Sequence, residues 1–207
     1  QTFRDKYFAL PGDMTNAQSF WGSSANCPGT SAQGNTDGKT CNGDGDGLIT
    51  PGAAASNESF RFWQHLANAG LIEGSYNGVT GSGAGIYVSV KANAPSSKLS
   101  NSLWSVANWG TTSGDLTLFD GAHGNSFQLG AAVTNGDNYY PVLKPEEAWN
   151  IDTKIDDGKP ATGKVVARAA VGGFSSCTTA ADSTGISSSY NLSYSQPFCT
   201  MFFQQLF

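Results

Sequence analysis

The sequence is poor in charged residues, which make up 13% of its 207 positions, about half the usual share. It holds only 11 Lys and Arg, carries a formal net charge of −5 and has no basic run. Binding to nucleic acid requires several basic side chains to neutralise phosphates, and binding to an anionic membrane surface has the same requirement. The composition therefore argues against both partners.

Patterns typical of membrane segments and of common active sites are also missing. The sequence has no leader peptide and no apolar run of transmembrane length. Its two histidines, His65 and His123, form no His-x-x-x-His pair, and Gly-x-Ser-x-Gly does not occur. Two facing carboxylates can hydrolyse sugars, but the sequence singles out no such pair. We therefore expect no enzymatic activity, and a hydrolase is the last of three alternatives.

Four cysteines fall in two local pairs, Cys27 with Cys41 and Cys177 with Cys199. Neither pair has the Cys-x-x-Cys spacing of zinc or redox sites. Each pair would close a loop rich in Gly, Ser and Thr, and closing about 15 residues stabilises by roughly 3 kcal/mol. We predict two disulfides in this pairing, and with them an oxidising compartment.

The first residues read as the end of an amphipathic helix. Phe3, Tyr7 and Leu10 have the spacing i, i+4, i+7, with charges between them. Asp13 is predicted to cap a short helix that runs through Phe20. We interpret residues 1–10 as the last part of a longer helix whose beginning was removed by processing or truncation.

The rest of the chain predicts an α+β fold in one domain, residues 1–207. Helices are expected from Ser56 or Asn57 to Gly70 and from Pro145 to about Ile155. Alternating or apolar segments predict strands at 86–90, 103–109, 116–119, 127–133, 164–171 and 200–207. We expect these helices to pack on one face of a small antiparallel sheet, between long disulfide-stapled loops.

The sharpest local motif is NGDGDGLI at residues 42–49, which matches the first half of an EF-hand calcium loop. Asn42, Asp44 and Asp46 place side-chain oxygens at loop positions one, three and five. Leu48 offers a backbone carbonyl at position seven. A solvated turn of Asn, Asp and Gly without metal is the alternative.

The motif departs from an EF-hand at position twelve, where Ala53 replaces the bidentate Glu. Glu58 follows five residues later and is the candidate to complete one Ca²⁺ site; Asp37 is another. A second acidic segment, residues 152–158, lacks the spacing of a calcium loop. We interpret it as a helix end followed by a turn.

The order of several motifs resembles the type IV pilin-like proteins, which include major and minor pilins and type II secretion pseudopilins. FRDKY at residues 3–7, followed by LPGDM at 10–14, is similar to the segment that follows the hydrophobic helix of these proteins. Residues 42–47, 58–67, 69–74 and 150–160 resemble one branch of the family. The prepilin cleavage site and the hydrophobic helix do not occur in this sequence.

The resemblance implies a pilin-like head, the globular part of a ladle-shaped subunit. A preceding helix would anchor the subunit in the inner membrane and then enter the core of a filament. The implied function is that of a structural subunit of a type IV pilus or a type II secretion-like filament, with a calcium-stabilised head. The implied partners are other pilin or pseudopilin subunits. The implied location is the periplasmic face of the inner membrane or an extracellular filament of a Gram-negative-type bacterium.

The second alternative is a surface adhesin or carbohydrate-binding module. Five Trp and seven Tyr lie among Gly-rich loops, and aromatic rings can form a stacking platform for a ligand. Exposure of Trp104 and Trp109 would favour such a surface ligand, and their burial would favour core packing.

Overall fold

A four-stranded antiparallel sheet with the order β1-β4-β6-β5 lies at the centre of the computed structural model. Its strands are β1 (Leu103–Asn108), β4 (Asn125–Gly130), β5 (Val165–Ala167) and β6 (Met201–Gln204). A short hairpin pairs β2 (Thr111–Thr112) with β3 (Gly121–Ala122). The helices are α1 (Thr2–Tyr7), α2 (Ala17–Trp21), α3 (Glu58–Asn68) and α4 (Pro145–Ile155). The structure describes residues 2–27, 34–51, 57–81, 92–115, 117–132, 138–168 and 176–204.

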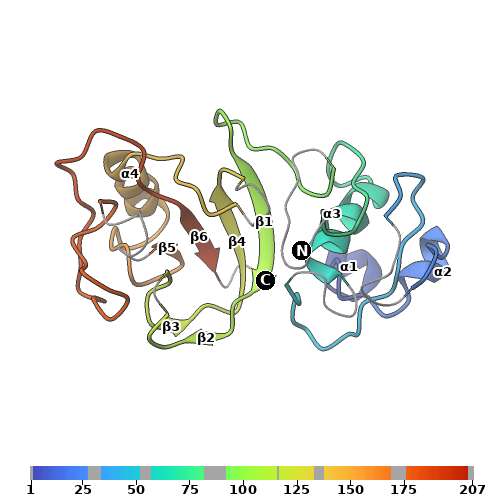
Figure 1. Ribbon diagram of the computed structural model, residues 1–207. Coiled ribbons are helices and arrows are strands. Elements are labelled where there is room, and N and C mark those ends of the chain that lie inside the picture. The colour runs from blue at the N-terminus through green and yellow to red at the C-terminus, as the bar shows by residue number, and fades with distance from the viewer. Residues whose placement is uncertain are drawn as a thin grey trace.

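One face of the sheet is apolar and carries both long helices. Phe127 pairs with Val106 on one side and with Phe203 on the other, so these three side chains share a face. α3 packs near the β1 edge, where Trp63 contacts Phe127. α4 packs near the β5 edge, where Ala148 joins a separate buried cluster. Figure 1 shows the two helices at opposite ends of the sheet. The middle of this face therefore lies between them.

The opposite face of the sheet buries polar groups that form hydrogen bonds with one another. The Asn138 amide accepts hydrogen bonds from Ser105 and Gln128 and donates to the Leu103 and Gln128 carbonyls. His123 bonds to Gln204 across the same layer. The donor groups of Ser105, Gln128 and Asn138 each have an acceptor, which lowers the cost of burying them. Oε1 of Gln128 has no partner among the described residues.

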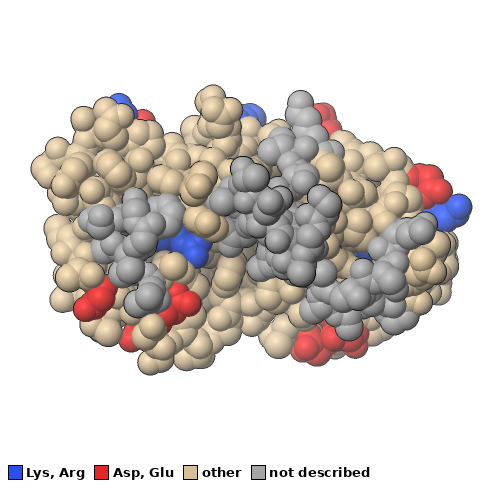
Figure 2. Space-filling model, in the orientation of Figure 1, with Lys and Arg blue, Asp and Glu red and all other residues tan. Residues whose placement is uncertain are grey.

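Both predicted disulfides are present, Cys27–Cys41 and Cys177–Cys199. They indicate an oxidising compartment, either extracellular or periplasmic. In the described part of the chain, no helix combines the length and the apolar character needed to cross a membrane. Figure 2 shows a surface made mostly of uncharged residues, as the composition implies.

The mixed α and β architecture is confirmed, whereas some local predictions are wrong. Residues 117–119 form no strand, because Asp115 binds the backbone N–H groups of Thr117 and Leu118 and turns the chain. Asp13 does not cap α2, whose N-cap is Asn16. The predicted strand at 86–90 lies outside the described residues.

Candidate functional site

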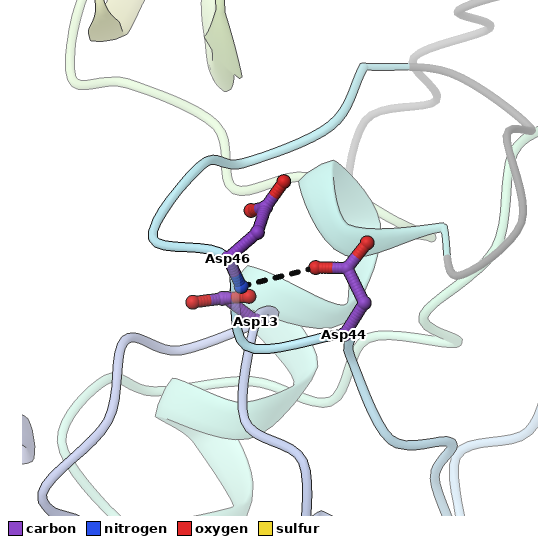
Figure 3. Close-up of side chains that lie close together, drawn as sticks. All are labelled: Asp13, Asp44 and Asp46. Carbon is purple, nitrogen blue, oxygen red and sulfur yellow. Dashed lines mark hydrogen bonds between the residues drawn. The ribbon is translucent and has the colours of Figure 1, made fainter.

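The acidic loop of residues 42–49 brings together three carboxylates, two of them predicted from the motif. Oxygen atoms of Asp44, Asp46 and Asp13 all lie within 4.8 Å of one another. Figure 3 shows Asp44 and Asp46 projecting from one loop and Asp13 reaching it from a different segment. Asp13 is buried, while Asp44 and Asp46 are exposed. The cluster is therefore a half-open site with a buried base.

The carboxylate of Asp13 shapes the acidic loop by binding backbone N–H groups of the loop. Its two carboxylate oxygens accept hydrogen bonds from the N–H groups of Gly45, at 2.7 Å, and Gly47, at 3.1 Å. The loop passes so close that a Cβ on Gly43 would lie 2.4 Å from the Asp13 backbone. Both contacts hold the Asp44 and Asp46 side chains next to Asp13.

The other predicted ligands have structural partners around this cluster. The buried carboxylate of Glu58 accepts the Asp44 N–H at 3.1 Å and the Thr50 N–H at 2.9 Å, so it spans the two ends of the loop. The Asn42 side-chain oxygen accepts the Gln18 N–H at 2.9 Å. Leu48 donates its N–H to Asp46 at 2.8 Å, and its side chain is exposed.

The electrostatics of the cluster are unfavourable without a cation. Burial, and after it the charges of Glu58 and Asp46, raise the pKa of Asp13 to about 6 against the lowering effect of the Gly47 and Gly45 hydrogen bonds. An ionised Asp13 is thus desolvated and faces like charges. A bound cation would relieve both penalties.

The donor set fits a hard divalent cation. Ca²⁺ binds oxygen ligands at about 2.3–2.6 Å, so two oxygens on one ion are separated by up to about 5 Å. The spacing in the cluster falls within that limit. Asp13, Asp44 and Asp46 would supply the anionic ligands, and Glu58 would position the loop from behind.

Sequence reasoning missed Asp13 because this residue is remote from the motif in the chain. Only the fold brings it beneath the loop, through the approach of Gly43 to its backbone. Asp37, the other predicted candidate, instead forms an ion pair with the Lys39 side chain at 3.2 Å and accepts a hydrogen bond from the Lys39 N–H.

The second acidic segment also gathers three carboxylates, from Asp152, Asp156 and Asp157. Hydrogen bonds within the protein account for their positions. Asp152 is fully buried and accepts the Tyr190 hydroxyl at 2.8 Å. Asp157 accepts the Thr162 hydroxyl at 2.7 Å. These bonds agree with a structural turn after α4.

An apolar groove of about 780 Å³ opens on the sheet face between α3 and the strands. Trp104, Phe127 and Phe203 contribute from the strands, and Trp63 and Tyr76 contribute on the α3 side. The ring centroids of Trp104 and Phe203 lie 5.5 Å apart. Its size is within the range of ligand pockets, and its lining is largely aromatic.

A second, separate hollow adjoins the groove near the first turn of α1. This hollow is lined by Thr2, Phe3 and Arg4, and it shares Ile72 and Phe127 with the groove. The start of the described chain thus lies beside a hollow that adjoins the apolar groove. In Figure 1 the N-terminus is drawn between β1 and α3.

Polar groups are few along the groove. Among the described lining residues, Glu73 is the one acid, and Ser75 and Ser96 add exposed hydroxyls. Trp104 is half-buried and lines the groove, whereas the half-buried Trp109 packs on Phe202 on the opposite face. The two tryptophans proposed as a platform therefore do not share a surface.

Comparison with known proteins gives no relative: no family model matches the chain, and neither the curated proteins nor the solved structures contain a significant match.

Proposed function

We propose that this chain is the head domain of a filament subunit of the type IV pilin or type II secretion pseudopilin kind. The observation that carries the proposal is the apolar groove on the sheet face, which adjoins a hollow lined by the first turn of α1. A helix that precedes Thr2 would continue α1 in this direction and cover Trp104, Phe127 and Phe203. The subunit acts by assembly, and the acidic cluster takes no part in a reaction.

Burial of aromatic surface supplies the driving force for this arrangement. Each aromatic side chain buries a large apolar area when it is covered, and removal of apolar surface from water contributes about 25 cal/mol per Å². An amphipathic helix laid in an apolar groove is a common mode of recognition. The low charge of the groove also suits an apolar helix face.

Calcium has a structural role in this proposal. A Ca²⁺ ion bound by Asp13, Asp44 and Asp46 ties the loop to the segment that follows α1. The loop also contacts α3 through Glu58. The ion therefore fixes the start of the head relative to α3. This arrangement sets the direction of the helix that precedes the head.

A carbohydrate ligand in the groove is the second candidate function, and it is favoured by the exposed part of Trp104. Glu73, Ser75 and Ser96 at the rim could bond to sugar hydroxyls. The two candidates predict different occupants for the same surface, namely a helix of the same protein or an external ligand.

The experiment that separates them starts from the natural protein. The gene is sequenced upstream of the codon for Gln1, and the intact mass of the purified natural protein is measured. We expect an apolar helix of about 20 residues directly before Gln1. The natural protein should also sediment with filaments. An upstream region without an apolar helix would contradict the proposal. Saturable binding of oligosaccharides to residues 1–207, lost in Trp104→Ala, would favour the second candidate.

A further inference from the structure

The Cys27–Cys41 disulfide has a buried cation against one of its sulfurs. Nη2 of Arg61 lies 3.1 Å from the Sγ of Cys41. Both Arg61 and Cys41 are completely buried. Burial lowers the pKa of Arg61 to about 10, so the guanidinium is still charged at neutral pH. A charge held this close stabilises a thiolate much more than a disulfide sulfur.

A polar network fixes the guanidinium in place. Nη1 of Arg61 donates to Oε1 of Gln64 at 2.7 Å, and the Thr40 hydroxyl donates to the same oxygen at 2.7 Å. The Gln64 amide nitrogen in turn donates to the carbonyls of Asn35 and Lys39. The position of the cation beside Cys41 is therefore determined by the fold rather than by a mobile side chain.

The two cysteines of this disulfide differ in exposure. Cys27 is half-buried, whereas Cys41 is completely buried. The Cys27 sulfur lies 3.6 Å from the Thr40 carbonyl, an acceptor to which a reduced Cys27 thiol would donate. Thiol–disulfide exchange is fastest when the accessible sulfur is attacked and the departing sulfur is the better thiolate. Both conditions point to attack at Cys27.

We propose that Cys27–Cys41 is a directional site for thiol–disulfide exchange, opened by a dithiol at Cys27 with Cys41 leaving as a thiolate beside Arg61. In the first step the attacking thiolate forms an S–S bond to Cys27, and the electron pair of the old bond goes to Cys41. In the second step the other thiol of the dithiol, as thiolate, displaces Cys27. The dithiol ends oxidised to its own disulfide, and the protein ends with two reduced cysteines. The partner class is a dithiol oxidoreductase or a small dithiol.

The second disulfide provides an internal reference. Cys177 and Cys199 are both buried, with 1% and 0% of their surface exposed. Neither sulfur is open to attack in the folded protein, so opening of this bond reports unfolding. The ratio of the two opening rates therefore separates directed exchange from general loss of structure.

The first test uses the wild-type chain under native conditions. The protein is treated with dithiothreitol, samples are trapped with iodoacetamide, and each cysteine is followed by mass spectrometry. We expect Cys27–Cys41 to open at least about tenfold faster than Cys177–Cys199. With glutathione as the probe, the mixed disulfide should form on Cys27, with Cys41 alkylated. Equal opening rates, or glutathione on Cys41, would overturn the proposal.

The second test removes the cation. Arg61→Gln should slow the opening of Cys27–Cys41 by about tenfold or more, and Arg61→Lys should restore part of the rate. Arg168→Gln is the matched control, since that buried guanidinium lies over the Tyr139 and Phe202 rings. A variant that unfolds would open both disulfides faster, which is the opposite of the slower opening expected for Arg61→Gln. An Arg61→Gln rate equal to that of wild type would refute the role of the cation.

Discussion

Replacing Asp13 by Asn should have opposite effects on stability in chelator and in calcium. The carboxylate is buried, its pKa is raised to about 6, and it carries hydrogen bonds from Gly45 and Gly47. Because the folded-state pKa lies above the unfolded value of 3.8, the folded form holds its proton more tightly. Stability therefore falls as the pH rises from about 4 to about 6, and the cost is fully present at neutral pH.

The size of the effect on stability follows from the rise in the pKa of Asp13. A rise from 3.8 to about 6 corresponds to an upper limit of about 3 kcal/mol at neutral pH. Asn removes that cost but has one acceptor oxygen, so it loses one of the two N–H partners, worth about 1 kcal/mol. The net gain for Asp13→Asn in chelator is thus about 2 kcal/mol. For a chain of this length, that corresponds to a Tm higher by about 4–8 °C.

Calcium should make the wild-type protein more stable than Asp13→Asn, the reverse of their order in chelator. A ligand present at about 100 times its Kd stabilises the wild-type protein by about 2.7 kcal/mol, whereas the variant has lost the buried ligand. The assay is thermal unfolding at neutral pH in chelator and in millimolar calcium. Asp152→Asn is the matched control, because the pKa of this other buried carboxyl is also raised to about 6; it should retain the calcium shift. Equal calcium shifts in wild type and Asp13→Asn, or none in either, would refute the reasoning.

Two further predictions concern the packing around the acidic groups. Burial raises the pKa of Asp152 to about 6 despite the Tyr190 hydrogen bond, so stability in chelator should fall between about pH 4 and 6. Urea unfolding across that pH range should show a smaller fall in the free energy of unfolding for Asp152→Asn than for wild type. An equal fall in the two proteins would contradict this prediction. Gly43→Ala should destabilise by about 1–3 kcal/mol and weaken the calcium shift, because its Cβ would meet the Asp13 backbone at 2.4 Å. Gly121→Ala, with no atom within 4 Å of the new Cβ, is the control, and similar melting curves for the two variants would contradict the close approach.

Local features of the fold could be predicted from the sequence because they depend on neighbouring residues. Pro145 followed by two acids marks the start of α4, and both disulfides join the nearest cysteines. The strands β1 and β4 lie within the predicted segments or overlap them. The alternation of apolar residues at 116–119 predicts a strand, but the described residues 117–119 lie in a bend in which Leu118 and Phe119 are buried.

Features that depend on distant segments could not be predicted. Asp13 joins the acidic loop only because residues 11–14 pass beneath Gly43. His65 is completely buried, and its Nδ1 accepts the Gly12 N–H at 2.9 Å across a sequence separation of 53 residues. The groove likewise combines Trp63 with Trp104, from a helix and a strand that the sequence does not place together.

In the proposed function, a helix that precedes Thr2 occupies the groove during assembly. The most direct measurement compares filament formation by the full-length protein carrying Ser96→Glu, which puts a charge at the exposed rim of the groove, with Ser195→Glu, an exposed site outside its described lining. We expect few or no filaments for Ser96→Glu, normal filaments for Ser195→Glu, and an unchanged Tm of the isolated head in both. Normal filaments in Ser96→Glu would contradict the proposed function.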